Sequence, residues 1–166
     1  MKNKIEIVDD FLSIKLCNKL INYFESNFSK AESHSVGFNK YIMDINITNV
    51  KDFNYLIKII NKYVLNQRCK IDWIKLVKWT DDCSQPLHLD QSKKNYSKIK
   101  TIYSSIMYLN DNYLGGQTFF EDGLIVRPIK GRALFFNGMY YKHGVMPVKK
   151  GPRYTLAAWY KNIKDR

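Results

Sequence analysis

The feature that most constrains the fold is a series of short β-prone segments after residue 70, separated by turn residues at close intervals. Glycine-containing pairs mark the turns, because glycine permits the backbone conformations that close a tight connection. These pairs are Gly115-Gly116, Asp122-Gly123, Lys130-Gly131, Asn137-Gly138 and Gly151-Pro152. The predicted strands cover residues 73–79, 101–109, 117–121, 124–128, 132–136, 142–147 and 153–160. Short strands at this spacing favour a β-sandwich or a small barrel.

The residues before this series predict two helices. A short strand over residues 4–8 precedes the first helix, which Asp10 or Ser13 can cap. The apolar stripes are Leu16, Leu20, Tyr23 and Phe24 in the first helix, and Phe53, Leu56, Ile57, Ile60 and Val64 in a second helix over residues 51–66. Residues 33–49 predict a loop followed by a strand. The sequence therefore predicts an α+β fold with N-terminal helices packed against a β-rich core, in a single domain over residues 1–166.

The net charge of +12 invites a nucleic-acid-binding interpretation, because clustered Lys and Arg displace counterions from phosphates. However, the chain is rich in Lys, Asn and Ile and poor in Arg, a bias typical of AT-rich bacterial or viral genomes. We therefore interpret most lysines as solvated. Two basic clusters flank the motifs described below: Lys93, Lys94, Lys98 and Lys100, and Lys149, Lys150 and Arg153.

The N-terminal residues and the cysteines predict the compartment. The N-terminus has no apolar signal-peptide region, and no apolar run reaches the length of a membrane span. Cys17, Cys69 and Cys83 are too widely spaced for a disulfide framework or a zinc ribbon, and Cys17 falls at a buried helical position. We expect a soluble cytoplasmic protein without a membrane partner.

Two histidines and one aspartate predict a metal site. In a strand, residues two apart point to the same side, so His88 and Asp90 would face one side together. His143 lies in another predicted strand. Two histidines and a carboxylate form the facial triad of non-haem iron(II) oxygenases, which leaves coordination positions open for substrate and oxygen.

Arg153 extends this metal site to a second ligand. It follows His143 by ten residues, past the Gly151-Pro152 turn. If the two predicted strands are adjacent and antiparallel, Arg153 returns close to the metal, and Thr155 shares its face. A buried guanidinium beside a hydroxyl is suited to binding a carboxylate.

These pieces occur in an order that resembles a known family. The segments are Ile5 to Cys17, Trp79, His88-Leu89-Asp90, Met107 to Asp111, Gly115 to Phe120, Val126 to Phe136, His143 to Val148, Gly151, Arg153 and Trp159. Along nearly the whole chain they are similar to the prolyl 4-hydroxylase-type branch of the iron(II)- and 2-oxoglutarate-dependent dioxygenases.

The resemblance implies a fold, cofactors and site residues. The fold would be a double-stranded β-helix, or jelly roll, with Fe(II) at its mouth on His88, Asp90 and His143. Arg153 would bind the distal carboxylate of 2-oxoglutarate, with further hydrogen bonds from Tyr108 and Thr155. Trp159 and Trp79 would lie near the substrate, and Trp79 stands where many members have a tyrosine. O2 would be the co-substrate and ascorbate the reductant.

The substrate is less constrained, because Thr101 stands where many prolyl hydroxylases carry a substrate-binding arginine. The first hypothesis is hydroxylation of prolyl residues in a protein or peptide. The alternatives are a free amino acid, another protein side chain or a small molecule. A nucleic-acid-repair role is disfavoured because no second arginine follows Arg153, as it does in the related dealkylases. A non-enzymatic module is disfavoured because all four site residues are present.

Two segments are predicted to border the site. The basic segment Gln91–Lys100 predicts a loop that closes over the site and favours an acidic substrate, together with Lys149 and Lys150. Residues 33–40 predict a loop on the other wall, with His34 at the surface rather than among the metal ligands.

Overall fold

The computed structural model describes residues 4–36, 40–65, 68–90 and 101–163. Its largest element is a seven-stranded antiparallel sheet. In spatial order the strands are β1 (Glu6–Val8), β10 (Ala133–Phe136), β6 (Thr101–Tyr108), β13 (Arg153–Asn162), β4 (Cys69–Trp79), β3 (Lys40–Asn46) and β2 (Glu32–Val36). β13 lies in the middle of this sheet, paired with β6 on one side and β4 on the other.

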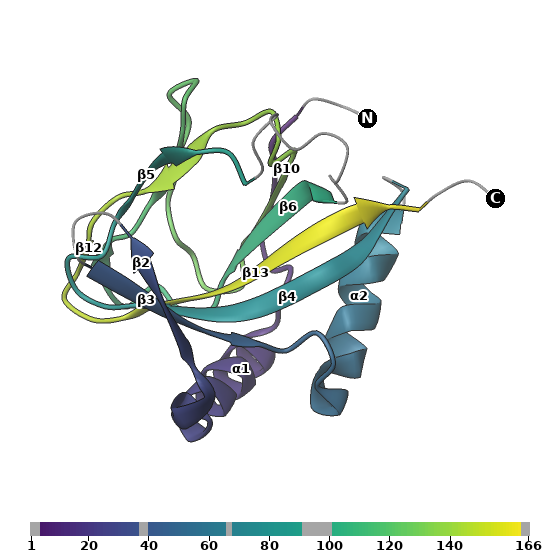
Figure 1. The fold of residues 1–166 in the computed structure, drawn as a ribbon, viewed down its shortest axis with the longest axis horizontal. Helices are drawn as coiled ribbons and strands as arrows, with labels where there is room; N and C mark the ends of the chain where they lie inside the picture. Colours follow the sequence, from purple (N-terminus) through teal and green to yellow (C-terminus); the bar gives the residue numbers. More distant parts are fainter. Residues whose placement is uncertain (1–3, 37–39, 66–67, 91–100, 164–166) are drawn as a thin grey trace.

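A smaller antiparallel sheet covers one face of the large sheet, as Figure 1 shows. Its order is β5 (Gln85–His88), β11 (His143–Val145), β8 (Thr118–Phe120) and β9 (Ile125–Val126), and a further pair joins β12 (Val148–Lys149) to β7 (Leu114–Gly115). Two facing antiparallel sheets with helices at one side confirm the predicted α+β, jelly-roll-type architecture.

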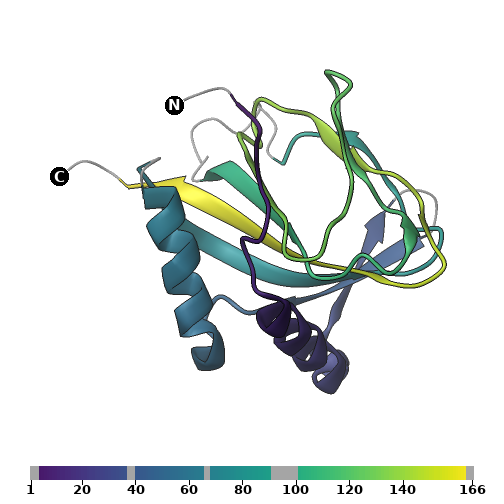
Figure 2. The same cartoon turned by 180° about the vertical axis from the view of Figure 1, so that it is seen from behind.

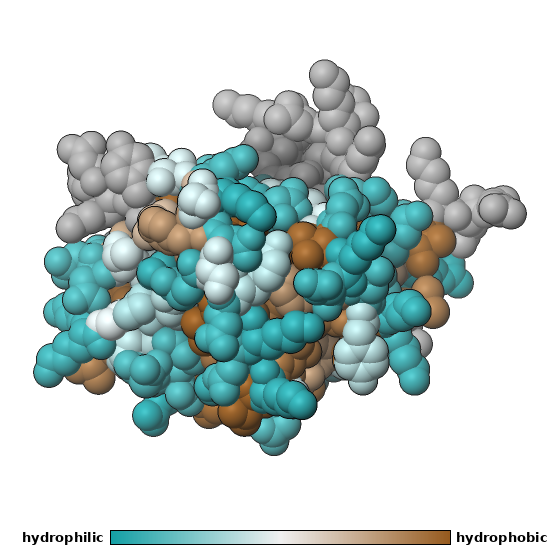
Figure 3. Space-filling view, turned by 90° about the horizontal axis from the view of Figure 1, so that it is seen from below, coloured by the Kyte–Doolittle hydropathy of each residue, from teal (hydrophilic) through white to brown (hydrophobic). Residues whose placement is uncertain are grey.

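The helices α1 (Ile14–Ser26) and α2 (Asn54–Leu65) pack on the opposite face of the large sheet, and they lie below it both in Figure 1 and in Figure 2, which shows the fold from behind. The short 3-10 helices η1 (Phe28–Lys30) and η2 (Lys51–Phe53) flank them. Ser13 caps α1, because its hydroxyl accepts a hydrogen bond of 3.3 Å from the backbone N–H of Leu16. From the helix side the surface is largely hydrophilic, with hydrophobic residues showing between the polar ones (Figure 3).

The main core lies between the helices and the large sheet. Both helices bury their predicted apolar stripes there, and all three cysteines are buried. Strand β13 separates this core from the space between the sheets, since Tyr154, Leu156 and Tyr160 join the main core while Arg153 and Thr155 face the other way. Among the described residues, no helix is both long and apolar enough to span a membrane.

The structure corrects one predicted element and adds three. Residues 33–36 are not a loop, because β2 forms a hairpin ladder with β3. An edge strand needs no continuous apolar face. The polar sequence Glu-Ser-His-Ser-Val therefore has no apolar alternation from which a strand could be predicted. Strands β5, β7 and β12, of two to four residues, are too short to give a pattern. Residues 37–39 and the predicted closing loop Gln91–Lys100 lie outside the described residues.

Candidate functional site

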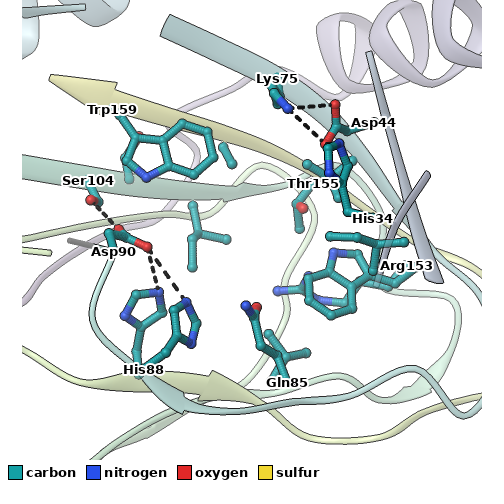
Figure 4. A pocket seen from close by; sticks show the side chains of 18 of the residues that line it. His34, Asp44, Lys75, Gln85, His88, Asp90, Ser104, Arg153, Thr155 and Trp159 are labelled. Atoms are coloured by element: carbon teal, nitrogen blue, oxygen red, sulfur yellow. Dashed lines mark hydrogen bonds and ion pairs between the residues drawn. The ribbon is translucent and has the colours of Figure 1, made fainter. Parts of the chain in front are cut away.

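A cavity of about 380 Å³ lies between the two sheets. Alternate residues of β4 and β13, together with residues 104–106 of β6, form its floor, and strand register arranges them in rows. One row holds Arg153 and Trp79, and the row at the other end holds Trp159, Trp73 and Ser104. Figure 4 shows Arg153 at one end, with Asp90, His88, Ser104 and Trp159 at the other. The cavity therefore has two chemically distinct ends.

The predicted metal residues His88, Asp90 and His143 converge at one end. His88 ends β5 and His143 begins β11, and the two are register partners in the small sheet. The Nε2 atoms of His88 and His143 lie 3.7 Å and 3.6 Å from Oδ1 of Asp90. The three candidate ligand atoms are all within 4.8 Å of one another, so one ion could contact all three.

The backbone conformation that brings Asp90 to this position differs from the predicted strand. Strand β5 ends at His88, so His88 and Asp90 do not share a strand face. Asp90 follows the strand in a bend, where its backbone N–H donates a 3.0 Å hydrogen bond to the carbonyl oxygen of Gly138. The two side chains are neighbours, as predicted, but a bend anchored on Gly138 brings them together.

Backbone carbonyls orient both histidine rings. Nδ1 of His88 lies 3.0 Å from the carbonyl oxygen of Pro86, and Nδ1 of His143 lies 3.3 Å from that of Tyr141. A carbonyl oxygen can only accept, so each Nδ1 carries a proton, and in the neutral form of each ring Nε2 offers a lone pair. A backbone acceptor at Nδ1 fixes the orientation of the ring and is typical of a metal-binding histidine.

The protonation of the three groups follows from their burial and their contacts. Burial disfavours the charged form of Asp90, but bonds from His88 and Ser104 and the charge of His143 outweigh it and lower its pKa. Burial also opposes the charged form of His88, yet its contacts with Asp90 and Pro86 raise the pKa of His88. Burial dominates at His143 and lowers its pKa. Asp90 is therefore the anionic group of the cluster at neutral pH.

Arg153 lies at the other end of the cavity and is only 1% exposed. Its guanidinium carbon is 5.1 Å from the ring centre of Trp79 and 5.4 Å from that of Tyr108. Thr155, which is 2% exposed, also lines the cavity. Arg153 does not reach the site through a strand paired with that of His143, because β11 and β13 belong to opposite sheets. Instead, Arg153 on the large sheet and His143 on the small sheet face the same cavity between the two sheets.

Thr118 also lies at the Arg153 end of the cavity, and it was not predicted from the sequence. Its hydroxyl oxygen accepts a 2.7 Å hydrogen bond from Tyr108 and lies 3.5 Å from Nη2 of Arg153. Thr118 is fully buried in β8, on the inward face that it shares with Phe120. The alternation of that strand could have indicated an inward Thr118, but no local signal pairs it with Arg153.

Three buried donors around Arg153 make no hydrogen bond within the described part of the chain. They are Nε of Arg153, Nε1 of Trp79 and the hydroxyl of Tyr113. Burial raises the pKa of Tyr113, so its hydroxyl keeps its proton and can donate. Buried donors are normally satisfied, because an unmade bond carries a desolvation penalty. These three donors lie at or around one guanidinium, so they fit a ligand with several anionic acceptor atoms, such as a carboxylate.

A family model matches this region of the chain. It is described as the 2OG-Fe(II) oxygenase superfamily, and it matches residues 74–161, more than half of the chain. The chain belongs to this superfamily. The matched range includes His88, Asp90, His143 and Arg153, so membership agrees with the resemblance seen in the sequence and identifies Fe(II) and 2-oxoglutarate as the family's cofactors.

Curated relatives of this oxygenase chain are prolyl hydroxylases. It is 32% identical over 96 residues to prolyl 3-hydroxylase 1 of Rattus norvegicus, a match that covers 48% of this chain and 13% of that protein. It is 40% identical over 65 residues to prolyl 3-hydroxylase 3 of Homo sapiens, covering 35% of this chain and 9% of that protein. The chain thus spans a small part of the length of these relatives.

Solved structures of the superfamily share the fold over nearly the whole chain. A viral collagen prolyl hydroxylase of Paramecium Bursaria Chlorella virus-1, in complex with 2OG, has a TM-score of 0.77 and 19% identity, covering 98% of this chain and 97% of that chain. A Pseudomonas putida prolyl-4-hydroxylase has a TM-score of 0.81 and 17% identity, covering 98% and 95%. These comparisons confirm the predicted double-stranded β-helix fold.

Two tryptophans form the end of the oxygenase cavity opposite Arg153, and a separate polar cluster on β4, β3 and β2 lines the side of the cavity nearer to Arg153. Trp73 and Trp159 stack with ring centres 4.0 Å apart. Lys75 pairs with Asp44 at 2.9 Å, and Nε2 of His34 also lies 2.9 Å from Asp44. His34 is thus not merely a surface residue, since it lines the cavity with 43% of its side chain exposed.

Trp79 lies away from this end. The resemblance predicts that both Trp159 and Trp79 contact substrate, but Trp79 packs against Arg153 and is 5% exposed. Its position favours contact with a ligand at the Arg153 end of the cavity. Lys149 and Lys150 are exposed outside the cavity lining, so the described residues give them no contact with the site.

Proposed function

We propose that this chain is an iron(II)- and 2-oxoglutarate-dependent hydroxylase of prolyl residues in a protein or peptide, with residues 1–166 acting as one catalytic domain. The observation that carries the proposal is the pairing of two half-sites in one cavity. His88, Asp90 and His143 converge at one end, and buried Arg153 with its partnerless donors lies at the other. The curated relatives named as prolyl hydroxylases support the choice of substrate class.

The metal ligands in this proposal are Nε2 of His88, Nε2 of His143 and Oδ1 of Asp90. Both histidines present Nε2 because Nδ1 is held by a backbone carbonyl. Iron(II) with 2-oxoglutarate and O2 supplies the oxidising chemistry when bound, and ascorbate would serve as reductant. The protein contributes a ligand set that backbone carbonyls and Ser104 hold in place, at one end of a cavity that extends towards Arg153.

Arg153 would hold the distal carboxylate of 2-oxoglutarate. A planar guanidinium offers parallel N–H donors that match a carboxylate, and a buried pair of this kind is strong. Thr155 would add a hydrogen bond from the cavity floor. Tyr108 would orient the site through Thr118, to which it donates. Nε1 of Trp79 and the hydroxyl of Tyr113 are further donors for the same anion.

Trp159 and Trp73 are the residues proposed to contact the substrate. Their stacked indoles offer an apolar wall beside Ser104 and Asp90, which is suited to the ring of a prolyl residue. A solved relative from Trichoplax adhaerens, with a TM-score of 0.81 and 16% identity over 97% of this chain and 84% of that chain, is described in complex with a peptide fragment. It supports a peptide substrate here, whereas nucleic acid has no support at the cavity, where Lys75 is paired with Asp44.

The test is turnover with defined peptides. The purified chain with Fe(II), 2-oxoglutarate, ascorbate and proline-containing peptides should form succinate and a peptide heavier by one oxygen. Analysis of the hydrolysed product would separate 3-hydroxyproline from 4-hydroxyproline. Succinate formation that no peptide in a broad proline-containing panel stimulates would contradict the prolyl substrate but not the cofactor assignment.

The cofactor assignment has its own test in the three histidines of the chain. His143→Ala should abolish both Fe(II) binding and turnover, because it removes one of three protein ligands. His34→Ala tests the second group of side chains close enough to hold a metal ion, Glu32, His34 and Asp44, which lies beside the same cavity. Its metal affinity should equal that of the unmodified chain. Full metal binding by His143→Ala would refute the proposed triad.

A further inference from the structure

The two carboxylate oxygens of Asp90 have different surroundings. Oδ1 faces Nε2 of both histidines, at 3.7 Å and 3.6 Å. Oδ2 faces away from them and accepts a short hydrogen bond from the hydroxyl of Ser104. Ser104 is 2% exposed and the Asp90 side chain is 11% exposed, so the bond is shielded from water. A hydroxyl-to-carboxylate bond in such surroundings is stronger than a neutral one.

Ser104 connects Asp90 to a rigid part of the fold. It belongs to β6 and is in register with Phe136 of β10 on one side and Trp159 of β13 on the other. His88 and His143 are carried by the small sheet instead. Asp90 itself lies beyond the end of β5, where its ladder bonds have stopped. The Ser104 bond thus ties this ligand to the large sheet.

Gly138 provides the space for this bond. A side-chain carbon at position 138 would lie 2.7 Å from Oδ2 of Asp90 and would collide with the hydroxyl of Ser104. Gly138 is not among the glycines with positive φ, so the backbone there does not itself require glycine. The carbonyl of Gly138 also accepts the backbone N–H of Asp90. The absence of a side chain is therefore a steric requirement of the Asp90 contacts.

We propose that Ser104 and Gly138 are positioning residues that hold Asp90 as a one-oxygen metal ligand. The inference rests on the proposed function, in which Asp90 binds the metal. With Oδ2 engaged by Ser104, only Oδ1 is directed towards the position between the histidines. A two-oxygen contact would take a further coordination position, so this arrangement keeps positions available for 2-oxoglutarate and O2.

The test measures metal affinity without turnover, by titrating the apo-protein with Co(II) or Mn(II). Ser104→Ala should weaken metal binding by about tenfold or more, the usual effect of removing a hydrogen bond to a metal ligand. Ser104→Thr keeps a hydroxyl and should recover most of the affinity. Ser105→Ala is the matched control, because this adjacent buried hydroxyl bonds to Tyr160 at 2.6 Å instead of to Asp90. Its metal affinity should stay unchanged.

A second variant keeps the Ser104 hydroxyl but removes its space. Gly138→Ala should weaken metal binding to a similar degree, and circular dichroism with thermal unfolding would show that the variant is folded. Metal affinities of Ser104→Ala and Gly138→Ala within about twofold of the unmodified chain would overturn the inference. An equal loss of metal affinity in Ser105→Ala would also overturn the inference.

Asp90→Ala separates this inference from the proposed function. If Asp90→Ala still binds metal with full affinity, the proposed function fails. If Asp90→Ala loses the metal while Ser104→Ala and Gly138→Ala retain it, the triad stands and only the positioning role of Ser104 and Gly138 is wrong.

Discussion

The end of the cavity around Arg153 and the end around Trp159 differ in how their polar atoms are satisfied. Around Arg153, Nε of the guanidinium, Nε1 of Trp79 and the hydroxyl of Tyr113 are buried without a partner among the described residues. At the other end, the hydroxyl of Ser104 donates to Asp90, and the wall beside it is the stack of the two indoles of Trp73 and Trp159. The first end is therefore built for a small anion, while the second should select its ligand by shape and stacking.

The largest effect is expected when the charge at the first end is removed. Arg153→Met should raise the concentration of 2-oxoglutarate needed for half-maximal succinate formation by about 100-fold or more, because losing one partner of a buried charge pair costs about 2–5 kcal/mol. Its affinity for Co(II) should be unchanged, since Arg153 is not near the metal ligands. The free energy of unfolding without ligand should be equal or higher, because a buried, incompletely paired guanidinium is replaced by an apolar side chain.

Arg153→Lys is the control for this change. It keeps the charge but lacks the fork geometry, so it should restore part of the 2-oxoglutarate affinity and not all of it. If Arg153→Met left the requirement for 2-oxoglutarate unaltered, the end around Arg153 would not be the anion site, and the proposed difference between the two ends would be wrong.

A smaller effect, on a different ligand, is expected at the second end. Trp159→Ala should raise the KM for a proline-containing peptide by about tenfold, as expected when an aromatic contact worth about 1 kcal/mol and its buried area are lost. The KM for 2-oxoglutarate should not change. Trp159→Phe should recover part of the loss, because it keeps a ring in stacking distance of Trp73. Equal changes in both KM values would mean that the two ends do not act separately.

At both ends of the cavity the sequence predicts part of the site and misses one residue. The joint order and spacing of His88, Asp90, His143 and Arg153 predict the ligand classes, although each of these residues alone carries little information. Thr118 and Ser104 could not be found this way. Each meets its partner only through the packing of segments far apart in the chain, and serine or threonine in a strand carries no local mark of that partner.

Short elements account for the remaining differences. The predicted pairing of the strands of His143 and Arg153 was wrong, because two strands that follow one another can belong to opposite sheets in a jelly roll. The bend at Asp90 follows a strand of four residues, which is too short for periodicity to define its end. The polar edge strand β2, which carries His34, lacks the apolar alternation on which strand prediction depends.

Two tyrosines near Arg153 allow a finer test of the partnerless donors. Tyr108→Phe should lower the free energy of unfolding by about 1 kcal/mol, because its hydroxyl donates to buried Thr118. Tyr113→Phe should change the free energy of unfolding by no more than about 0.5 kcal/mol, because its hydroxyl faces the Arg153 guanidinium but makes no well-formed hydrogen bond within the described residues. Tyr113→Phe should nevertheless raise the 2-oxoglutarate requirement severalfold. Urea unfolding and succinate assays would show whether stability and binding separate in this way.

The smallest effect is expected on the opposite face of β13, where Tyr154 faces α1. Glu25 accepts hydrogen bonds from Tyr154 at 2.7 Å and from Lys78 at 2.9 Å. Burial alone would raise the pKa of Glu25, but these two bonds outweigh it and lower the pKa below its usual value. Because the folded state holds the charged carboxylate, this contribution to stability is present above the unfolded pKa and is lost as pH falls through the folded pKa. Glu25→Gln should therefore reduce the unfolding free energy near neutral pH, and the difference should disappear in acid.

The size of the Glu25 effect should stay below about 1 kcal/mol, because 45% of its side chain is exposed and water screens the pair. Urea unfolding of both proteins across the acid range would measure it. The KM values for 2-oxoglutarate and for peptide should both stay unchanged, since Tyr154 and Arg153 point to opposite sides of the same strand. A shift in either KM would mean that strand β13 transmits changes from the helix side into the cavity, and the effects assigned to Arg153 and Trp159 would then need to be corrected for that coupling.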